Sequence, residues 1–166
     1  MDSVNYENKN FAHNAHSIGA SEYHLQWATK YRYGTLEKES HWKDCETAIR
    51  DVAKRHVIEI VALGVMPDHV HTVVVLSPDM SPSRAVALLK GGSAYELFRS
   101  HPNFRKTYWG GHFWSRGYFY RSVSNVTDDV VRRYVREDNN PRTSKQRKLT
   151  CKNILYSRNV RPNKFF

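Results

Sequence analysis

The sequence predicts an α+β fold in which helices cover one face of an antiparallel sheet. Apolar and polar side chains alternate over residues 22–32, the pattern of a half-buried strand. Apolar side chains then recur at helical spacing over residues 41–56. Two further apolar runs, 57–65 and 69–76, are separated by a proline–aspartate turn, which is typical of two strands in a hairpin.

The remaining elements complete the order of the fold. Residues 77–99 predict a loop followed by a helix, with Ser81 or Ser83 as the N-cap. Residues 111–123 predict a fourth strand, and residues 127–138 predict a final helix. Strand, helix, strand, strand, helix and strand in this order are the split β-α-β arrangement of ferredoxin-like folds, to which the final helix is an addition.

A chain of 166 residues suits one compact domain. We expect a flexible N-terminal arm over 1–20, the domain over 21–140 and a basic C-terminal tail over 141–166. Two distant cysteines give no metal spacing and favour a reducing compartment. With neither a signal peptide nor an apolar run of membrane-spanning length in the sequence, the expected location is cytoplasmic, with no membrane partner.

The charge balance favours an anionic partner. The chain holds 26 Lys and Arg against 16 Asp and Glu, a formal net charge of +10. Nucleic acid is the first candidate for such a partner, and an acidic membrane surface is the second. Ten tyrosines, seven phenylalanines and four tryptophans add rings on which unpaired bases could stack, although most such rings fill protein cores.

The segment MPDHVHTVVVL places two histidines at the start of an apolar strand. Alternation along a strand puts His69 and His71 on one face, roughly 7 Å apart, where two imidazoles can converge on one cation. Val70 points to the opposite face, which is the natural one for the helices. The histidines are therefore expected on the open face at the start of the strand, where solvent and substrate can reach them. Val73 and Val75 share this face, so a partner subunit or the final helix is expected to cover it further along. An isolated H-x-H pattern is also common among surface histidines.

Five segments within about residues 16–140 carry a further signal. In chain order they are YHLQWATKYR, VMPDHVHTVV, LLKGGSAYELF, WGGHFWSRGYF and VVRRYVRED. The PDHVH stretch matches the histidine-hydrophobe-histidine (HUH) motif of single-strand-specific nucleases. Together, and in this order, the five segments resemble the small single-tyrosine transposases of bacterial and archaeal insertion sequences.

The resemblance implies a ferredoxin-like homodimer that cleaves and rejoins single-stranded DNA. By position the nucleophile is Tyr134, which would form a covalent 5′-phosphotyrosine link and free a 3′ hydroxyl. Mg²⁺ would bind at His69 and His71, and Mn²⁺ should substitute by ligand preference. DNA hairpins near the element's ends would be bound, and the tyrosine helix could serve the partner subunit's histidines.

The third metal ligand departs from the family pattern. Family members carry a glutamine four residues after the tyrosine, and here that position is Asp138. Residues i and i+4 share a helix face, so Tyr134 and Asp138 point together, and a carboxylate is a hard oxygen ligand. Glu137 is the alternative third ligand.

Several basic residues are candidate DNA contacts, and collectively they predict salt-dependent binding. Four aromatic residues after the second helix could be core, interface or base-stacking groups. Three other histidines have no spacing that connects them to the pair. The basic residues are Arg84, Lys90, Arg132, Arg133 and Arg136. The aromatic residues are Trp109, Phe113, Trp114 and Tyr118. The other histidines are His24, His101 and His112.

Other functions remain open from the sequence. A relaxase would place its tyrosine before the histidines, and many replication initiators carry a lysine where Asp138 stands. A metallo-β-lactamase would need an aspartate shortly after the pair, and a (β/α)₈ hydrolase needs a far longer chain. A domesticated relative that processes repeated chromosomal palindromes fits the same motifs. A non-catalytic ferredoxin-like nucleic-acid-binding module would need neither the histidines nor Tyr134.

Overall fold

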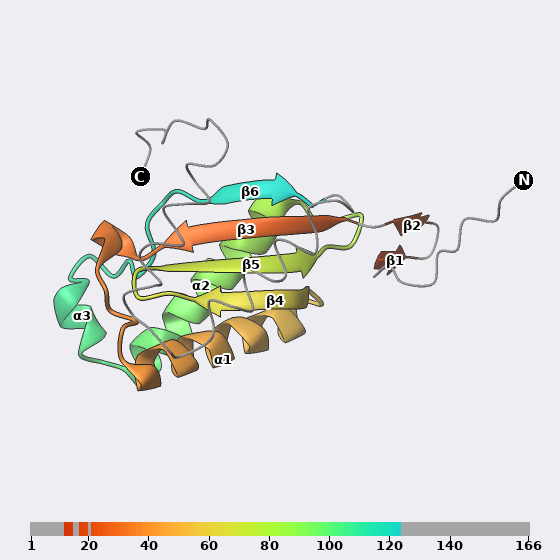
Figure 1. Cartoon of the computed structure of the whole chain (residues 1–166). Helices are drawn as coiled ribbons and strands as arrows, with labels where there is room; N and C mark the ends of the chain where they lie inside the picture. The colour runs from red at the N-terminus through yellow and green to blue at the C-terminus, as the bar shows by residue number, and fades with distance from the viewer. Residues whose placement is uncertain (1–11, 15–16, 20, 124–166) are drawn as a thin grey trace, which may run out of the picture.

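A computed structural model describes residues 12–14, 17–19 and 21–123 (Figure 1). Four antiparallel strands form its main sheet, in the order β4-β5-β3-β6. This order confirms the predicted ferredoxin-like fold. The added C-terminal helix and the predicted tail lie outside the described residues. The strands are β3 (Glu22–Ala28), β4 (Glu59–Val65), β5 (His69–Val75) and β6 (Phe119–Ser122).

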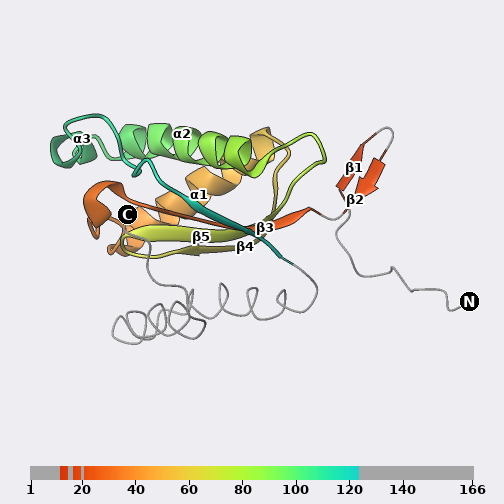
Figure 2. The ribbon, with the colours of Figure 1, turned by 90° about the horizontal axis from the view of Figure 1, so that it is seen from above.

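Two long helices cover one face of this sheet (Figure 2). α1 (Glu39–Arg55) buries Ile49 and Val52, and α2 (Pro82–Ser100) buries Val86, Leu89 and Leu97. The helices pack directly on each other where Gly92 meets Val52, because a Cβ at Gly92 would lie 2.5 Å from Val52 Cγ2. No helix in the described part of the chain is long and apolar enough to cross a bilayer.

The ends of the helices follow from local sequence. Of the two predicted N-cap candidates, Ser81 is the residue that caps α2. Its Oγ accepts a hydrogen bond from the backbone N of Arg84 at 3.2 Å. α1 begins two residues earlier than expected, at Glu39. α1 ends before Val57, which adopts a left-handed backbone (φ 54°), so β4 begins at Glu59 rather than at Val57.

The predicted strand over residues 22–32 is shorter in the structure. β3 ends at Ala28, and a 3-10 turn, η1 (Lys30–Arg32), follows. Tyr31 and Arg32 have φ values of 61° and 54°, which no β-strand can accommodate. Alternation of side chains cannot reveal this reversal, because it depends on contacts with the turn before β5.

The fourth predicted strand, 111–123, is also shorter. β6 holds its last part, and only a single bridge between Thr29 and Trp114 connects the earlier part to the sheet. Before it lies a short helix that the sequence analysis missed, α3 (Phe104–Thr107). Phe113 and Trp114 are buried in the core, where their rings pack under α2. Because of this packing, the segment forms little strand pairing with β3.

The predicted arm over residues 1–20 contains regular structure. β1 (Ala12–Asn14) and β2 (Ser17–Gly19) form a separate antiparallel pair. Each of these strands has three residues, which is too short for alternation of apolar and polar side chains to predict it.

Candidate active site

The two histidines of the HxH motif lie on the sheet face opposite the helices, as predicted. Val70 and Val74 belong to the core with α1 and α2, whereas Val73 packs in a separate cluster with Ala62. The rings of His69 and His71 are 5.8 Å apart, centroid to centroid, at an angle of 64°. This spacing brings two imidazoles close enough to share one ion.

The prediction that solvent can reach the two histidines is wrong. His69 is 7% exposed and His71 is 2% exposed, so both are buried. β5 is a central strand with β3 on one side and β4 on the other, and every residue of β5 is buried. Alternation along one strand gives the face on which a side chain lies but not its exposure, which depends on contacts with the rest of the chain.

His69 is oriented by the residue before it. Asp68 Oδ1 lies 2.7 Å from His69 Nδ1. The pKa of Asp68 is lowered, since the hydrogen bond with His69, the charge of His69 and Arg32 together outweigh burial, its largest influence, which acts in the opposite direction. A carboxylate can only accept, so Nδ1 carries the proton, and in the neutral form of the ring the lone pair lies on Nε2. That nitrogen is the one suited to a metal.

Gly64 makes room for the second histidine. Gly64 and His71 are direct partners in the β4–β5 ladder, so their side-chain positions share a face. A Cβ at Gly64 would overlap with Nε2 and Cδ2 of His71. Glycine is required here because the imidazole lies over the β4 backbone.

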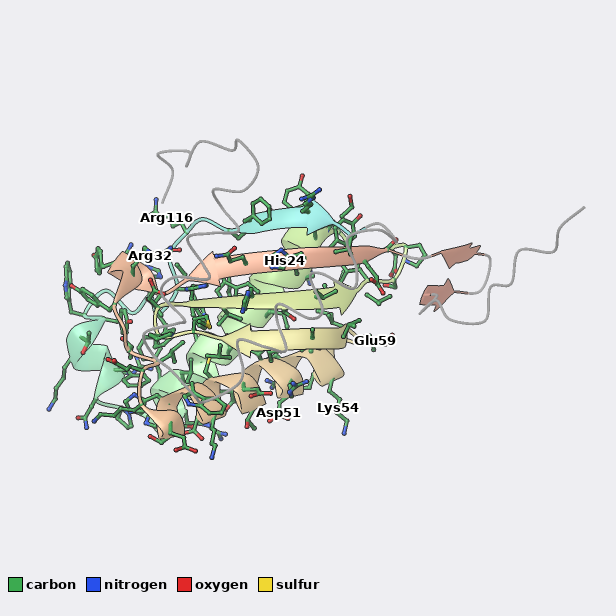
Figure 3. The ribbon with its side chains drawn as sticks, in the orientation of Figure 1. His24, Arg32, Asp51, Lys54, Glu59 and Arg116 are labelled. Atoms are coloured by element: carbon green, nitrogen blue, oxygen red, sulfur yellow. The ribbon has the colours of Figure 1, made fainter. Side chains whose placement is uncertain are left out.

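His24 joins the pair, which the sequence analysis did not foresee. It lies opposite Val73 in the β3–β5 ladder, and its ring centroid is 6.2 Å from that of His71. Figure 3 shows His24 on β3 and Arg32 in the loop that follows the strand. Alternation does place His24 on one face of its own strand, but only the register of the sheet sets that face beside His71.

Burial keeps two of these imidazoles neutral. It lowers the pKa of His71 to about 3, with further contributions from His69 and His24. Burial also lowers the pKa of His24 to about 4, and the charge of Arg121 acts in the same direction. Neutral imidazole is the form that binds metals, so His24 and His71 are in the protonation state that a metal ligand needs at neutral pH.

The other half of the predicted site lies outside the described residues. This applies to Tyr134, Asp138 and Glu137, and to the arginines at 132, 133 and 136. Among the residues that the structure describes, no group of three or more His, Cys, Asp or Glu has the geometry of a metal site.

Comparison with known proteins now decides the family. Residues 17–138 match the model of the IS200-like transposases. The chain belongs to this family. The matched range agrees with the resemblance expected from the sequence, about residues 16–140, and includes both histidines and position 134.

Two curated relatives of the family are transposases. The chain is 35% identical to the ISDra2 transposase TnpA of Deinococcus radiodurans over 116 residues, which are 69% of this chain and 81% of the relative. It is 27% identical to the transposase for insertion sequence element IS200 of Salmonella typhimurium over 127 residues, 75% of this chain and 83% of the relative.

Solved structures share the fold. A transposase-family protein of Deinococcus radiodurans has a TM-score of 0.63 at 33% identity, covering 76% of this chain and 96% of its own. A REP-associated tyrosine transposase bound to a REP hairpin has a TM-score of 0.52 at 17% identity, covering 74% of this chain and 68% of its own. The latter supports the fold alone.

Two of the predicted DNA contacts, Arg84 and Lys90, lie within the described residues, and their surroundings differ. Arg84 is exposed in the first turn of α2. Lys90 Nζ instead donates to three backbone carbonyls, at 2.8, 3.1 and 3.3 Å, in residues 115–117. Burial lowers the pKa of Lys90. Its three donors hold the loop before β6, and its DNA contact stays a prediction.

The aromatic candidates also separate. Trp109 is 83% exposed, whereas Phe113 and Trp114 are core residues and Tyr118 is half-buried against the core. Of the four, Trp109 therefore offers the most accessible ring for a partner. Of the histidines without assigned spacing, His101 binds Asp44 at 2.8 Å and stacks on Phe104, far along the chain from the HxH motif.

Proposed function

We propose that this family member is a metal-dependent transposase that cleaves and rejoins single-stranded DNA at insertion-sequence ends through a covalent bond to Tyr134. The observation that supports the mechanism best is the HxH pair itself. His69 and His71 share one sheet face with ring centroids 5.8 Å apart, and Asp68 contacts His69 through Nδ1 rather than through Nε2. A nucleic-acid-binding module would have no need of this arrangement.

The donor set suits Mg²⁺ or Mn²⁺ when an oxygen ligand completes it. His69 and His71 would hold the ion, with Asp138 as the third ligand and Glu137 as its alternative. Two imidazoles favour Mn²⁺, while a carboxylate is acceptable to both ions. When bound, the ion would withdraw charge from the scissile phosphate and align it.

Tyr134 is the proposed nucleophile. A tyrosine hydroxyl has an ordinary pKa of about 10, so it must lose its proton as it attacks. Its oxygen forms a bond to phosphorus, the bond from phosphorus to the 3′ oxygen breaks, and that oxygen leaves as a hydroxyl after gaining a proton. The 5′-phosphotyrosine ester keeps the bond energy, so a new 3′ hydroxyl can reverse the step without ATP.

The proposed substrate is single-stranded DNA with hairpins. The net charge of +10 favours a polyanion, and a protein of the same fold is bound to a hairpin. Arg84, Arg132, Arg133 and Arg136 are the proposed phosphate contacts, with Lys90 the least accessible of the predicted set. The cytoplasmic location of the protein remains part of this proposal.

A homodimer with shared active sites is the proposed assembly. β6 is an edge strand in the described sheet, and Phe119 and Tyr120 on it are 43% and 56% exposed. Exposed apolar edge strands favour pairing with another chain. A second copy could therefore add to this edge and bring its tyrosine helix to the histidines.

A covalent-adduct assay tests the mechanism. Labelled single-stranded hairpin DNA is incubated with the protein and Mg²⁺ or Mn²⁺, then denatured and separated by electrophoresis. We expect a protein–DNA adduct that disappears in Tyr134→Phe and in His69→Ala. Tyr95→Phe is the matched control, because Tyr95 is 66% exposed on α2 and should keep the adduct.

The outcomes separate the alternatives. An adduct that persists in Tyr134→Phe assigns the nucleophile to another residue. DNA binding without an adduct for every metal and hairpin favours the binding module, and adducts only with chromosomal palindromes favour the domesticated nuclease. Mixed Tyr134→Phe and His69→Ala proteins should regain partial activity if sites are shared, whereas an inactive mixture contradicts shared sites.

A further inference from the structure

The loop after β3 and the turn before β5 form one hydrogen-bonded unit. The backbone N of Thr29 donates to the carbonyl of Asp68 at 2.9 Å, and that of Leu36 donates to the carbonyl of Pro67 at 3.0 Å. The hydroxyl of Thr29 lies 2.8 Å from the carbonyl of Tyr33 and 3.1 Å from that of Asp68. The loop therefore holds the residue that precedes His69.

The loop keeps an unfavourable backbone within this unit. Tyr31 and Arg32 are left-handed, with φ of 61° and 54°, and neither is glycine. Such a conformation costs about 1–2 kcal/mol for each residue, and it persists only where surrounding contacts impose it. The reversal directs the Arg32 side chain back toward the HxH strand.

Arg32 meets the carboxylate that orients His69. Arg32 Nε is 3.1 Å from Asp68 Oδ2, and Asp68 Oδ1 is 2.7 Å from His69 Nδ1. Each carboxylate oxygen thus has its own partner, and rotation of the carboxylate would break both contacts. A carboxylate that binds the other ring nitrogen of a metal-binding imidazole fixes both the tautomer and the orientation of the ring.

We infer that Arg32 is a positioning residue that acts through Asp68 to hold His69 ready for the metal. The inference rests on the proposed function. The contact itself adds little stability, because the Arg32 side chain is 50% exposed and exposed ion pairs contribute about 0–1 kcal/mol. Metal affinity, rather than folding, is therefore the property that should respond.

Metal binding by the full chain without DNA tests the inference. The probe is Mn²⁺, and its free concentration is measured by electron paramagnetic resonance. Removing an outer partner of a metal ligand commonly costs about 10- to 100-fold in affinity, and we expect this for Asp68→Ala. Arg32→Gln should lose about 3- to 10-fold, since it acts one residue further away. Arg32→Lys, which keeps the charge, should recover part of the loss.

Two controls separate positioning from other effects. Arg116→Gln removes an exposed arginine outside the loop and should keep wild-type affinity. Urea unfolding of Arg32→Gln should stay within about 1 kcal/mol of wild type. If Arg32 instead contacts DNA phosphates, Arg32→Gln should keep wild-type Mn²⁺ affinity in this assay, because DNA is absent. That result would overturn the inference.

The tautomer of His69 gives a readout that needs no metal. Long-range ¹H–¹⁵N spectra of the apoprotein should show Nδ1 protonated in the wild type and a shift toward the other tautomer in Asp68→Ala. If Asp68→Ala does not fold, Asp68→Asn replaces it in this measurement, because asparagine keeps the shape of the side chain. Wild-type protein that binds no Mn²⁺ contradicts the proposed function, whereas wild-type binding with unchanged affinity in Arg32→Gln contradicts this inference alone.

Discussion

The two faces of β5 are stabilised in different ways. On the helix face, Val70 and Val74 are fully buried and pack with α1 and α2. On the other face, His69 and His71 depend on the carboxylate of Asp68 and on the missing side chain of Gly64. Changes on the first face should lower stability, while changes on the second should alter metal binding more than folding.

The largest expected effect is on the helix face. Trp27 is 1% exposed and meets Trp114 edge-on with ring centroids 6.0 Å apart. Trp27→Ala should lower the free energy of unfolding by about 3–5 kcal/mol, as for other large core truncations. Urea unfolding followed by circular dichroism measures this. Trp109→Ala is the control, and equal losses in the two variants would contradict the assigned core.

Gly64→Ala tests the histidine face. The new Cβ must displace the His71 imidazole, at a cost of about 1–3 kcal/mol, and Mn²⁺ affinity should fall more sharply than stability does. Gly91→Ala is the matched control, since no atom lies within 4 Å of its added Cβ and alanine favours a helix by about 0.5–1 kcal/mol. Wild-type Mn²⁺ affinity in Gly64→Ala would show that His71 does not need this space.

Thr72 is a polar exception on the helix face. Its Oγ1 donates to the Ala62 carbonyl at 2.7 Å, next to the irregular pairing between Ile60 and Ala62. Thr72→Val keeps the volume but removes this donor, which should cost about 1–2 kcal/mol in unfolding experiments. Thr72→Ser should restore most of the loss, and a serine variant as unstable as the valine variant would assign the effect to packing.

The smallest expected effect near neutrality concerns pH. The pKa of His24 falls from 6.5 unfolded to about 4 folded, so the unfolded chain binds more protons between these values. The contribution of neutral His24 to the free energy of unfolding is therefore present above pH 6.5 and is lost as pH falls toward 4. This loss amounts to about 1 kcal/mol by pH 6. His71, lowered to about 3, acts in the same direction.

Urea unfolding from pH 7.5 to 5, with EDTA present, measures this dependence. His24→Gln should reduce the loss of stability on acidification, while His56→Gln, at an exposed position after α1, should leave it unchanged. The same loss in His24→Gln as in the wild type would show that protonation of His24 does not limit the stability of this face.

Local patterns determined much of the fold and half of the candidate site. Helical spacing identified α1 and α2, the proline–aspartate turn identified the β4–β5 hairpin, and alternation placed His69 and His71 on one face. These features depend on residues within a few positions of each other, so the sequence contains them directly. The ladder between β3 and β5 joins residues 41 to 53 positions apart, and no local pattern specifies its register.

The sequence by itself therefore determined the two long helices, the order of the main strands, the family and the histidine pair. Only the tertiary structure decided what surrounds that pair. It set His24 beside His71 through strand register, placed Gly64 under the imidazole, and returned Arg32 to Asp68 through a left-handed turn. Each of these contacts joins separate segments, and the physical reason is that packing of the whole sheet, rather than local preference, selects the register and the backbone conformation that create them.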